Sequence, residues 1–161
     1  MAFDYFMKEF FRDLYRSAKV DTDLKVGSLP LQIDCVIELS NKIITNQTQL
    51  PIPLLTNHFR RYNLFEFKSS HDLTKNSDLL KLMGYLGLWG EKKQDSLISI
   101  ETEYTLWYLT ANSTHFIHQL TALGKLKSTA FDGLYQLTIP FPCPYYLLVI
   151  EEIPCTIETA P

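Results

Sequence analysis

Two carboxylates and a lysine lie on two segments of the sequence that alternate apolar and polar residues. Asp34 lies in the first segment, and Glu66 and Lys68 lie in the second. Hydrolysis of a phosphodiester requires a hard cation, because the cation offsets charge on the phosphate and lowers the pKa of the attacking water. Mg²⁺ takes one or two carboxylates from a protein and keeps most of its waters. Asp34 and Glu66 therefore predict a site for Mg²⁺ (or Mn²⁺), with the backbone carbonyl of Phe67 as a further ligand.

Lys68 follows Glu66 by two residues, so the two side chains share one face of a strand, about 6–7 Å apart along it. An ammonium group at this position would orient the attacking water and stabilise the negative charge that develops on the phosphate. A nearby cation also keeps both carboxylates ionised, as metal binding requires. The alternative is a solvent-exposed strand face, on which acids and lysines alternate without a catalytic role. The spacing by itself leaves that alternative open.

The periodicity of apolar residues predicts the elements that position these side chains. Residues 3–18 have apolar side chains at helical spacing, with Lys8, Glu9, Arg12 and Arg16 on the opposite face, and predict an amphipathic helix packed on the core. The other predicted elements are a loop at 21–28, a strand at 31–39, a loose hairpin or ordered loop at 41–53, a strand at 62–68, a helix from Asn76 or Ser77 to 87–90, strands at 96–100 and 104–109, a helix at 113–123 closed by Gly124, and strands at 133–139 and 145–150. This order predicts one α/β domain with a mixed β-sheet and helices on both sides.

The element order and the set Asp34, Glu66 and Lys68 resemble the PD-(D/E)XK nuclease superfamily, whose core is a helix, a strand hairpin bearing Asp and Glu-x-Lys, a helix and a strand. Residues 29–34 and 57–70 resemble bacterial proteins of the recombination-promoting nuclease and transposase group. The similarity continues more weakly through residues 78–85 and the later strand.

This resemblance implies a restriction-endonuclease-like mixed β-sheet flanked by helices, with residues 1–161 forming a single domain. It assigns Asp34 and Glu66 to metal binding and Lys68 to the role of catalytic lysine. The implied function is a Mg²⁺-dependent DNA endonuclease that acts in recombination, mobile-element or defence activity. Such enzymes often cut both strands as a homodimer, so a homodimer is expected here.

Two features concern how closely the chain follows the family pattern. No proline precedes Asp34. The first helix of the family often supplies a further acid, for which Glu9 and Asp13 are the two candidates, and the sequence does not choose between them.

Composition excludes several classes of protein. The 161 residues are 46% hydrophobic and 20% charged, as in a globular domain that buries its own core. There is no apolar run long enough to span a membrane and no basic segment ahead of the first apolar residues, so neither a membrane partner nor a signal peptide is expected. The three cysteines lack ligand-like spacing, which predicts reduced, buried thiols in a cytoplasmic protein.

Charge along the chain indicates where DNA would bind. Although the net charge is −3, residues 57–93 carry seven basic against four acidic residues, a net +3. Residues 94–161 carry two basic against seven acidic residues, a net −5. An anionic partner is therefore expected to contact the middle of the chain.

Within this basic region, His58, Arg60 and Arg61 precede the Glu66 strand and are candidates for contacts with backbone phosphates. Lys81 and Tyr85 lie one helical turn apart on the next helix, and their family position predicts that they face the site, with Lys81 as a further residue expected to bind nucleic acid. For each, the alternative is an ordinary solvated or packing role. His115 and His118 have a spacing that permits shared metal ligation, but without a third ligand nearby, polar-face histidines are the simpler interpretation.

A second function stays open beside the nuclease. A protein that keeps this fold without catalysis would act as a nucleic-acid or protein binding module. The acidic balance favours this alternative, whereas the complete set Asp34, Glu66 and Lys68 favours the enzyme.

Overall fold

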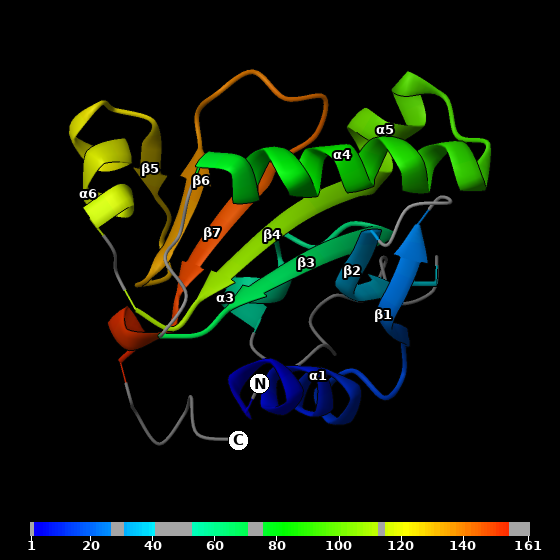
Figure 1. Ribbon diagram of the computed structural model, residues 1–161, viewed down its shortest axis with the longest axis horizontal. Coiled ribbons are helices and arrows are strands. Elements are labelled where there is room, and N and C mark those ends of the chain that lie inside the picture. The colour runs from blue at the N-terminus through cyan, green and yellow to red at the C-terminus, as the bar shows by residue number, and fades with distance from the viewer. Residues whose placement is uncertain (1, 27–30, 41–52, 71–75, 113–114, 155–161) are drawn as a thin grey trace.

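The computed structural model describes residues 2–26, 31–40, 53–70, 76–112 and 115–154. Across these residues the chain is a mixed α/β fold built on a seven-stranded sheet with the order β1-β2-β3-β4-β7-β6-β5 (Figure 1). The strands are β1 Lys19–Val26, β2 Leu31–Glu38, β3 Tyr62–Lys68, β4 Tyr104–Thr110, β5 Leu126–Ser128, β6 Leu134–Leu137 and β7 Tyr145–Val149. The helices are α1 Ala2–Leu14, α3 Pro53–Thr56, α4 Asn76–Lys93, α5 Leu97–Glu103, α6 His115–Ala122 and the 3₁₀ helix η2 Ile150–Glu152.

The sheet is mixed because its centre is parallel and its flanks are antiparallel. β3, β4 and β7 run parallel, which requires the long crossovers that contain α4, α5 and α6. The pairs β1–β2, β2–β3, β7–β6 and β6–β5 are antiparallel. The last residues of β3 and β4, Lys68 and Thr110, are register partners, so the two strands end together at one edge of the sheet.

Helices cover both faces of the sheet, as predicted, with α4 across one face and α1 across the other (Figure 1). Leu82 and Leu86 of α4 pack with Leu64 and Leu106 in one buried cluster. The opposite cluster is aromatic. It joins α1 to the other side of the same strands, and its rings include Phe11, Tyr15, Phe59, Phe65 and Trp107. Two layers of packing therefore hold β3 rigidly between helices.

The first helix is confirmed but shorter than predicted, since it ends at Leu14. Met7, Phe11 and Tyr15 are buried as expected. The predicted placement of Lys8 on the solvent face is wrong: only 7% of this residue is exposed. Lys8 is buried because two carboxylates from different elements hold its ammonium group, as described below.

The prediction of a loop at 21–28 is wrong for residues 21–26, because β1 runs from Lys19 to Val26 and all of its residues except Asp23 pair with β2. Residues 27 and 28 lie outside the described residues. Val20 packs with the α1 cluster and Leu24 with the α4 cluster. These two residues are four apart but pack on opposite faces, because the strand is irregular at Asp23, so the sequence shows no two-residue alternation here. Charge on an edge strand is common because it discourages pairing with other chains.

The helix after the site was predicted to end at its glycines, but α4 continues to Lys93. A Cβ on Gly90 would lie 3.1 Å from the Ile100 Cδ1, so the glycine allows α5 to approach the helix closely. The strand predicted at 96–100 is wrong as well, since α5 occupies this stretch. Its start is set by Ser96, whose hydroxyl accepts the Ser99 N–H at 3.1 Å as an N-cap.

The remaining strands and the helix after β4 agree with prediction to within a few residues. Gly124 has φ +65°, the left-handed conformation expected of a glycine that closes a helix. β5 was not predicted, because its three residues are too few to show a period. The predicted hairpin or loop at 41–53 lies outside the described residues apart from Pro53, which begins α3.

Candidate active site

Asp34 lies where the ladder between β2 and β3 ends. The last register pair is Cys35 with Phe65, and the next pair would be Asp34 with Glu66. Instead of a further backbone pair, the Phe67 N–H donates to the Asp34 Oδ2 at 2.8 Å. A side chain thus replaces the backbone acceptor, and the two strands part beside the two carboxylates.

The other edge of β2 is distorted at the same residue. The register with β1 contains Thr22–Cys35 and Leu24–Ile33 but omits the pair of Asp23 with Asp34. Asp23 has φ +57°, a conformation unusual within a strand. Interruptions of this kind re-aim side chains next to functional sites. Asp34 is therefore freed from regular pairing on both sides.

Glu66 is the buried acid of the site, with 2% of the residue exposed. Its Oε1 accepts from the Lys81 Nζ at 2.7 Å, and the Lys68 Nζ lies 3.7 Å from the same oxygen. Its Oε2 is buried and has no hydrogen-bond partner among the described residues. A buried carboxylate oxygen without a donor is costly, so this atom is the clearest sign that the site can receive a cation or a water.

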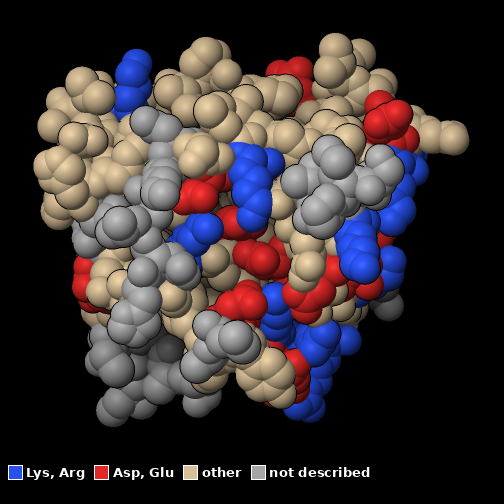
Figure 2. Space-filling view, viewed as in Figure 1, with Lys and Arg blue, Asp and Glu red and all other residues tan. Residues whose placement is uncertain are grey.

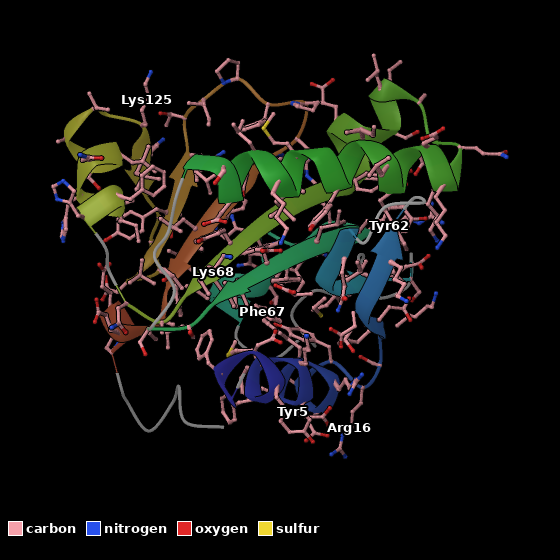
Figure 3. The ribbon with its side chains drawn as sticks, in the orientation of Figure 1. Tyr5, Arg16, Tyr62, Phe67, Lys68 and Lys125 are labelled. Atoms are coloured by element: carbon pink, nitrogen blue, oxygen red, sulfur yellow. The ribbon has the colours of Figure 1, made fainter. Side chains whose placement is uncertain are left out.

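Lys68 lies between two acids from different elements. Its Nζ is 3.7 Å from the Glu66 Oε1 and 3.4 Å from the Asp78 Oδ1, in the first turn of α4. Both distances exceed those of a direct charge-assisted hydrogen bond, so the ammonium group is held by charge on two sides. In Figure 3, Lys68 lies at the end of β3 between α4 and α1, and Phe67 projects on the α1 side of the strand.

The electrostatics of the pair favour cation binding. Burial, followed by the charge of Glu66, raises the pKa of Asp34 to about 7, although the hydrogen bond from Phe67 acts in the opposite direction. Burial lowers the pKa of Lys81, but the hydrogen bond and charge of Glu66 outweigh burial, so this pKa lies above its ordinary value. Asp34 and Glu66 thus repel each other when both are ionised, and a cation between them would relieve that repulsion.

The acid that α1 brings to this region is Asp4, which sequence reasoning missed. Its Oδ2 accepts from the Lys8 Nζ at 2.8 Å, and the Asp23 Oδ1 lies 2.6 Å from the same nitrogen. The charge of Asp4 contributes to the raised pKa of Asp34, so the two carboxylates are close enough to interact. The other oxygen of Asp4, Oδ1, is buried and lacks a partner in the described part of the chain.

The two acids proposed from the sequence lie elsewhere on α1. Glu9 pairs with Arg12, and Asp13 pairs with Arg16, both on the exposed side of the helix. The signal that could have identified Asp4 is its spacing of four residues before Lys8, which places both on one helix face.

The basic residues predicted to contact DNA lie at two different ends of β3. Lys81 does face the site, and its ammonium group lies 5.2 Å from the ring centroid of Tyr85. Arg60 and Arg61 precede β3, about 20 Å and 16 Å along the strand from Glu66, so they are not brought to the carboxylates. Arg60 donates to the Glu101 carbonyl, and Arg61 pairs with the Glu103 carboxylate at 3.2 Å.

His58 and the histidine pair also lie away from the carboxylates. The His58 Nδ1 lies 3.1 Å from the Tyr146 hydroxyl, and burial lowers the pKa of His58. His115 contacts Gln119 on the surface of α6. Across the described residues, His, Cys, Asp and Glu side chains form no group of three or more placed to hold a metal ion.

A smaller donor set is nevertheless available at the end of β3. Asp34 and Glu66 supply two carboxylates, and the Glu66 Oε2 is buried without a donor in the described structure. The Phe67 N–H points toward β2, so its carbonyl points to the same side of the strand. These oxygen donors suit a hard cation such as Mg²⁺, which needs few protein ligands. Figure 2 shows acidic and basic side chains together in the middle of this face, between α4 and α1.

Comparison with protein-family models, with curated proteins and with solved structures found no match to this chain. None of the helices in the described regions is both long and apolar enough to cross a membrane.

Proposed function

We propose that this protein is a Mg²⁺-dependent DNA endonuclease with a restriction-endonuclease-like fold. The observation that carries the proposal is the meeting of Asp34, Glu66 and Lys68 where β2 and β3 part, with one oxygen of Glu66 buried and without a hydrogen-bond partner in the described part of the chain. Asp34 comes from the middle of β2, Glu66 and Lys68 come from the end of β3, and Asp78 in the first turn of α4 lies beside Lys68. The expected biological setting is recombination, mobile-element or defence activity.

The order of elements supports the same proposal. A helix, an antiparallel strand pair that carries Asp and Glu-x-Lys, a second helix and a parallel strand occur in this order as α1, β2–β3, α4 and β4, with β1, α3 and α5 between them. That is the core order of the PD-(D/E)XK nuclease superfamily. Asp4 on α1 takes the part of the additional helix acid that the superfamily often carries.

Each residue has a defined part in the proposed reaction. Asp34 and Glu66 hold the cation, with the Phe67 carbonyl as a further donor. The chemistry that a bound Mg²⁺ supplies is neutralisation of phosphate charge and a lowered pKa of the attacking water. Lys68 orients that water and stabilises charge on the phosphate oxygens, since it is the cation that extends from the strand beside Glu66. Asp78 restrains Lys68 from the opposite side.

A binding module without catalysis is the second candidate, and one contact favours it. The Lys81 ammonium group already lies 2.7 Å from the Glu66 Oε1 and supplies a positive charge to this carboxylate without a metal. In this case the site would be a neutralised structural cluster. The two candidates differ in whether the cluster binds a divalent cation.

Cleavage of supercoiled plasmid with Mg²⁺ or Mn²⁺ tests the proposal. We expect nicking by the wild type and a loss of about 100-fold or more in Lys68→Ala and Asp34→Asn. Lys125→Ala is the matched control, because Lys125 is exposed and lies just before β5, far from the site in Figure 3. Equal nicking by all four proteins would refute the site.

Metal binding separates the two candidates if the wild type cleaves neither plasmid nor single-stranded DNA. The melting temperature is then measured in Mg²⁺ and in EDTA. A rise in Mg²⁺ that Asp34→Asn abolishes places a cation at the carboxylates, whereas no rise in either protein supports the binding module.

A further inference from the structure

A second feature of the molecule lies at the other end of β3. A cavity of about 660 Å³ is lined by charged and hydroxyl side chains that include Ser17, Lys19, Glu38, Ser40, Arg61 and Lys93. They come from the turn after α1, the start of β1, the end of β2 and the residues just after it, the residue before β3 and the last turn of α4. Tyr62, labelled in Figure 3, marks this end of the strand, opposite Lys68.

Three cations line the cavity against one carboxylate. The Glu38 Oε2 lies 3.5 Å from the Lys93 Nζ and 3.9 Å from the Lys19 Nζ, so one acid is shared between two ammonium groups at long distances. Lys19 also pairs with Asp21 at 3.0 Å. Arg61 is likewise paired, with Glu103 at 3.2 Å. Neither Asp21 nor Glu103 lines the cavity, so the lining itself carries more positive than negative charge and suits an anion.

Aromatic rings hold two of the cations in place. The Lys93 Nζ lies 5.2 Å from the ring centroid of Tyr62 and 5.1 Å from that of Trp89. The Arg61 guanidinium carbon lies 5.0 Å from the same Tyr62 ring. A cation held over a ring loses less freedom when it binds a ligand, so the array is organised before an anion arrives.

A simpler explanation accounts for only part of this array. Lys92 and Lys93 lie in the last turn of α4, where cations offset the negative end of the helix dipole. Helix stabilisation does not require Lys19 and Arg61, which reach the same cavity from two other elements. Convergence from separate elements is therefore the observation that indicates a ligand.

We propose that this cavity binds a phosphate group of a nucleic-acid strand whose reacting phosphate lies at Asp34 and Glu66. The identity of the ligand rests on the proposed nuclease function; the cavity and its charge do not. Arg61 and Glu66 are five residues apart on the chain, about 16 Å along an extended strand. That span equals about five nucleotides of rise along one strand of duplex DNA.

The test is binding of fluorescent 12-nucleotide single-stranded and duplex DNA in EDTA, where metal-dependent cleavage cannot occur. Lys93→Gln and Arg61→Gln are compared with Lys92→Gln, which is the matched control. Lys92 is the same residue type in the same helical turn, and its Nζ also lies over the Trp89 ring, at 5.4 Å, but it does not line the cavity.

We expect Lys93→Gln and Arg61→Gln each to weaken binding about 5- to 10-fold at low salt. Each should also reduce the slope of log affinity against log salt by about 0.7 for single strands and 0.9 for duplex. Lys92→Gln should stay within about two-fold of wild type. Thermal unfolding of each variant checks that it remains folded, and Arg61→Gln serves as the second test if Lys93→Gln does not fold.

Each result decides the proposal. If the cavity variants and Lys92→Gln bind alike, or if the wild type does not bind DNA, the cavity assignment is wrong. A free phosphate ion is the other ligand with the same chemistry, so binding of inorganic phosphate is measured by Trp fluorescence. If the protein binds phosphate through Lys93 but does not bind DNA, the nucleic-acid assignment is overturned. If DNA binding depends on Lys93 but no metal-dependent cleavage is found, the cavity is supported as a DNA-binding site and the proposed nuclease activity is refuted.

Discussion

Replacing Asp34 with asparagine should stabilise the metal-free protein at alkaline pH. The pKa of Asp34 is raised from 3.8 to about 7, mainly by burial and by the charge of Glu66. The folded state therefore holds this proton more tightly than the unfolded state. The protein loses stability as pH rises from 3.8 toward 7, and the full penalty is present above pH 7.

The size of the effect follows from the same shift. A difference of about 3 pKa units corresponds to about 4 kcal/mol, and partial exposure of Asp34 reduces the expected gain to about 2 kcal/mol at pH 8. Asparagine is the suitable replacement because its carbonyl oxygen can still accept the Phe67 N–H. At pH 5 the gain should fall to about a third of its value at pH 8, and near pH 3.5 it should vanish.

Urea unfolding in EDTA at pH 8, 5 and 3.5 measures this prediction directly. Asp13→Asn is the control, since Asp13 is exposed and forms a surface pair with Arg16, and it should change the unfolding free energy by less than about 0.5 kcal/mol. Mg²⁺ should stabilise the wild type at pH 8 and leave Asp34→Asn unchanged. A variant less stable than wild type at pH 8 in EDTA would refute the argument that the two carboxylates repel each other.

The other predictions concern single contacts. Lys81→Met removes the ammonium group that bonds Glu66, so thermal unfolding in EDTA should show a loss of about 3 kcal/mol, which Mg²⁺ partly restores; no loss would show that the pair is unimportant. Gly133→Ala should cost more than about 2 kcal/mol in urea unfolding, because φ is +78° and the new Cβ would meet a backbone oxygen at 2.6 Å. Gly124→Ala, with φ +65° and open space, should cost about 1 kcal/mol, and an equal cost at both positions would contradict this reasoning. Ser96→Ala removes a helix N-cap and should lower the unfolding free energy by about 1 kcal/mol, while Ser96→Asp should keep it.

The sequence predicted the strands that carry the site because their own alternation is strong. β2 and β3 pair through apolar residues on both sides, so residues such as Phe65 and Cys35 could be placed without knowledge of the rest of the chain. The placement of Lys68 beside Glu66 followed from the two-residue period alone. Where local pattern and tertiary packing agree, the prediction held.

The errors occur where tertiary contacts override local pattern. Residues 97–100 have the composition of a strand but lie in α5, which Ser96 caps and which packs closely on Gly90 through Ile100. Lys8 was placed on the surface because its burial depends on Asp23, fifteen residues away on β1. The spacing of Asp4 and Lys8 places both on one helix face, but the position of Asp4 near Asp34 depends on how α1 crosses the sheet. Interactions of this kind require the fold to be known first.

The two edge strands restrict how copies of this chain can associate. β1 carries the charged side chains Lys19, Asp21, Asp23 and Lys25 along its length, and β5 offers only three residues to a neighbour. The backbone and side chains of a strand added beside β1 would lie close to these charges. β5 is too short to fix the register of an added strand. Growth of the sheet by edge-to-edge addition is therefore disfavoured at both ends. A homodimer that cut both strands of DNA would have to assemble through helices or loops, which would leave the open side of β2 and β3 facing the substrate.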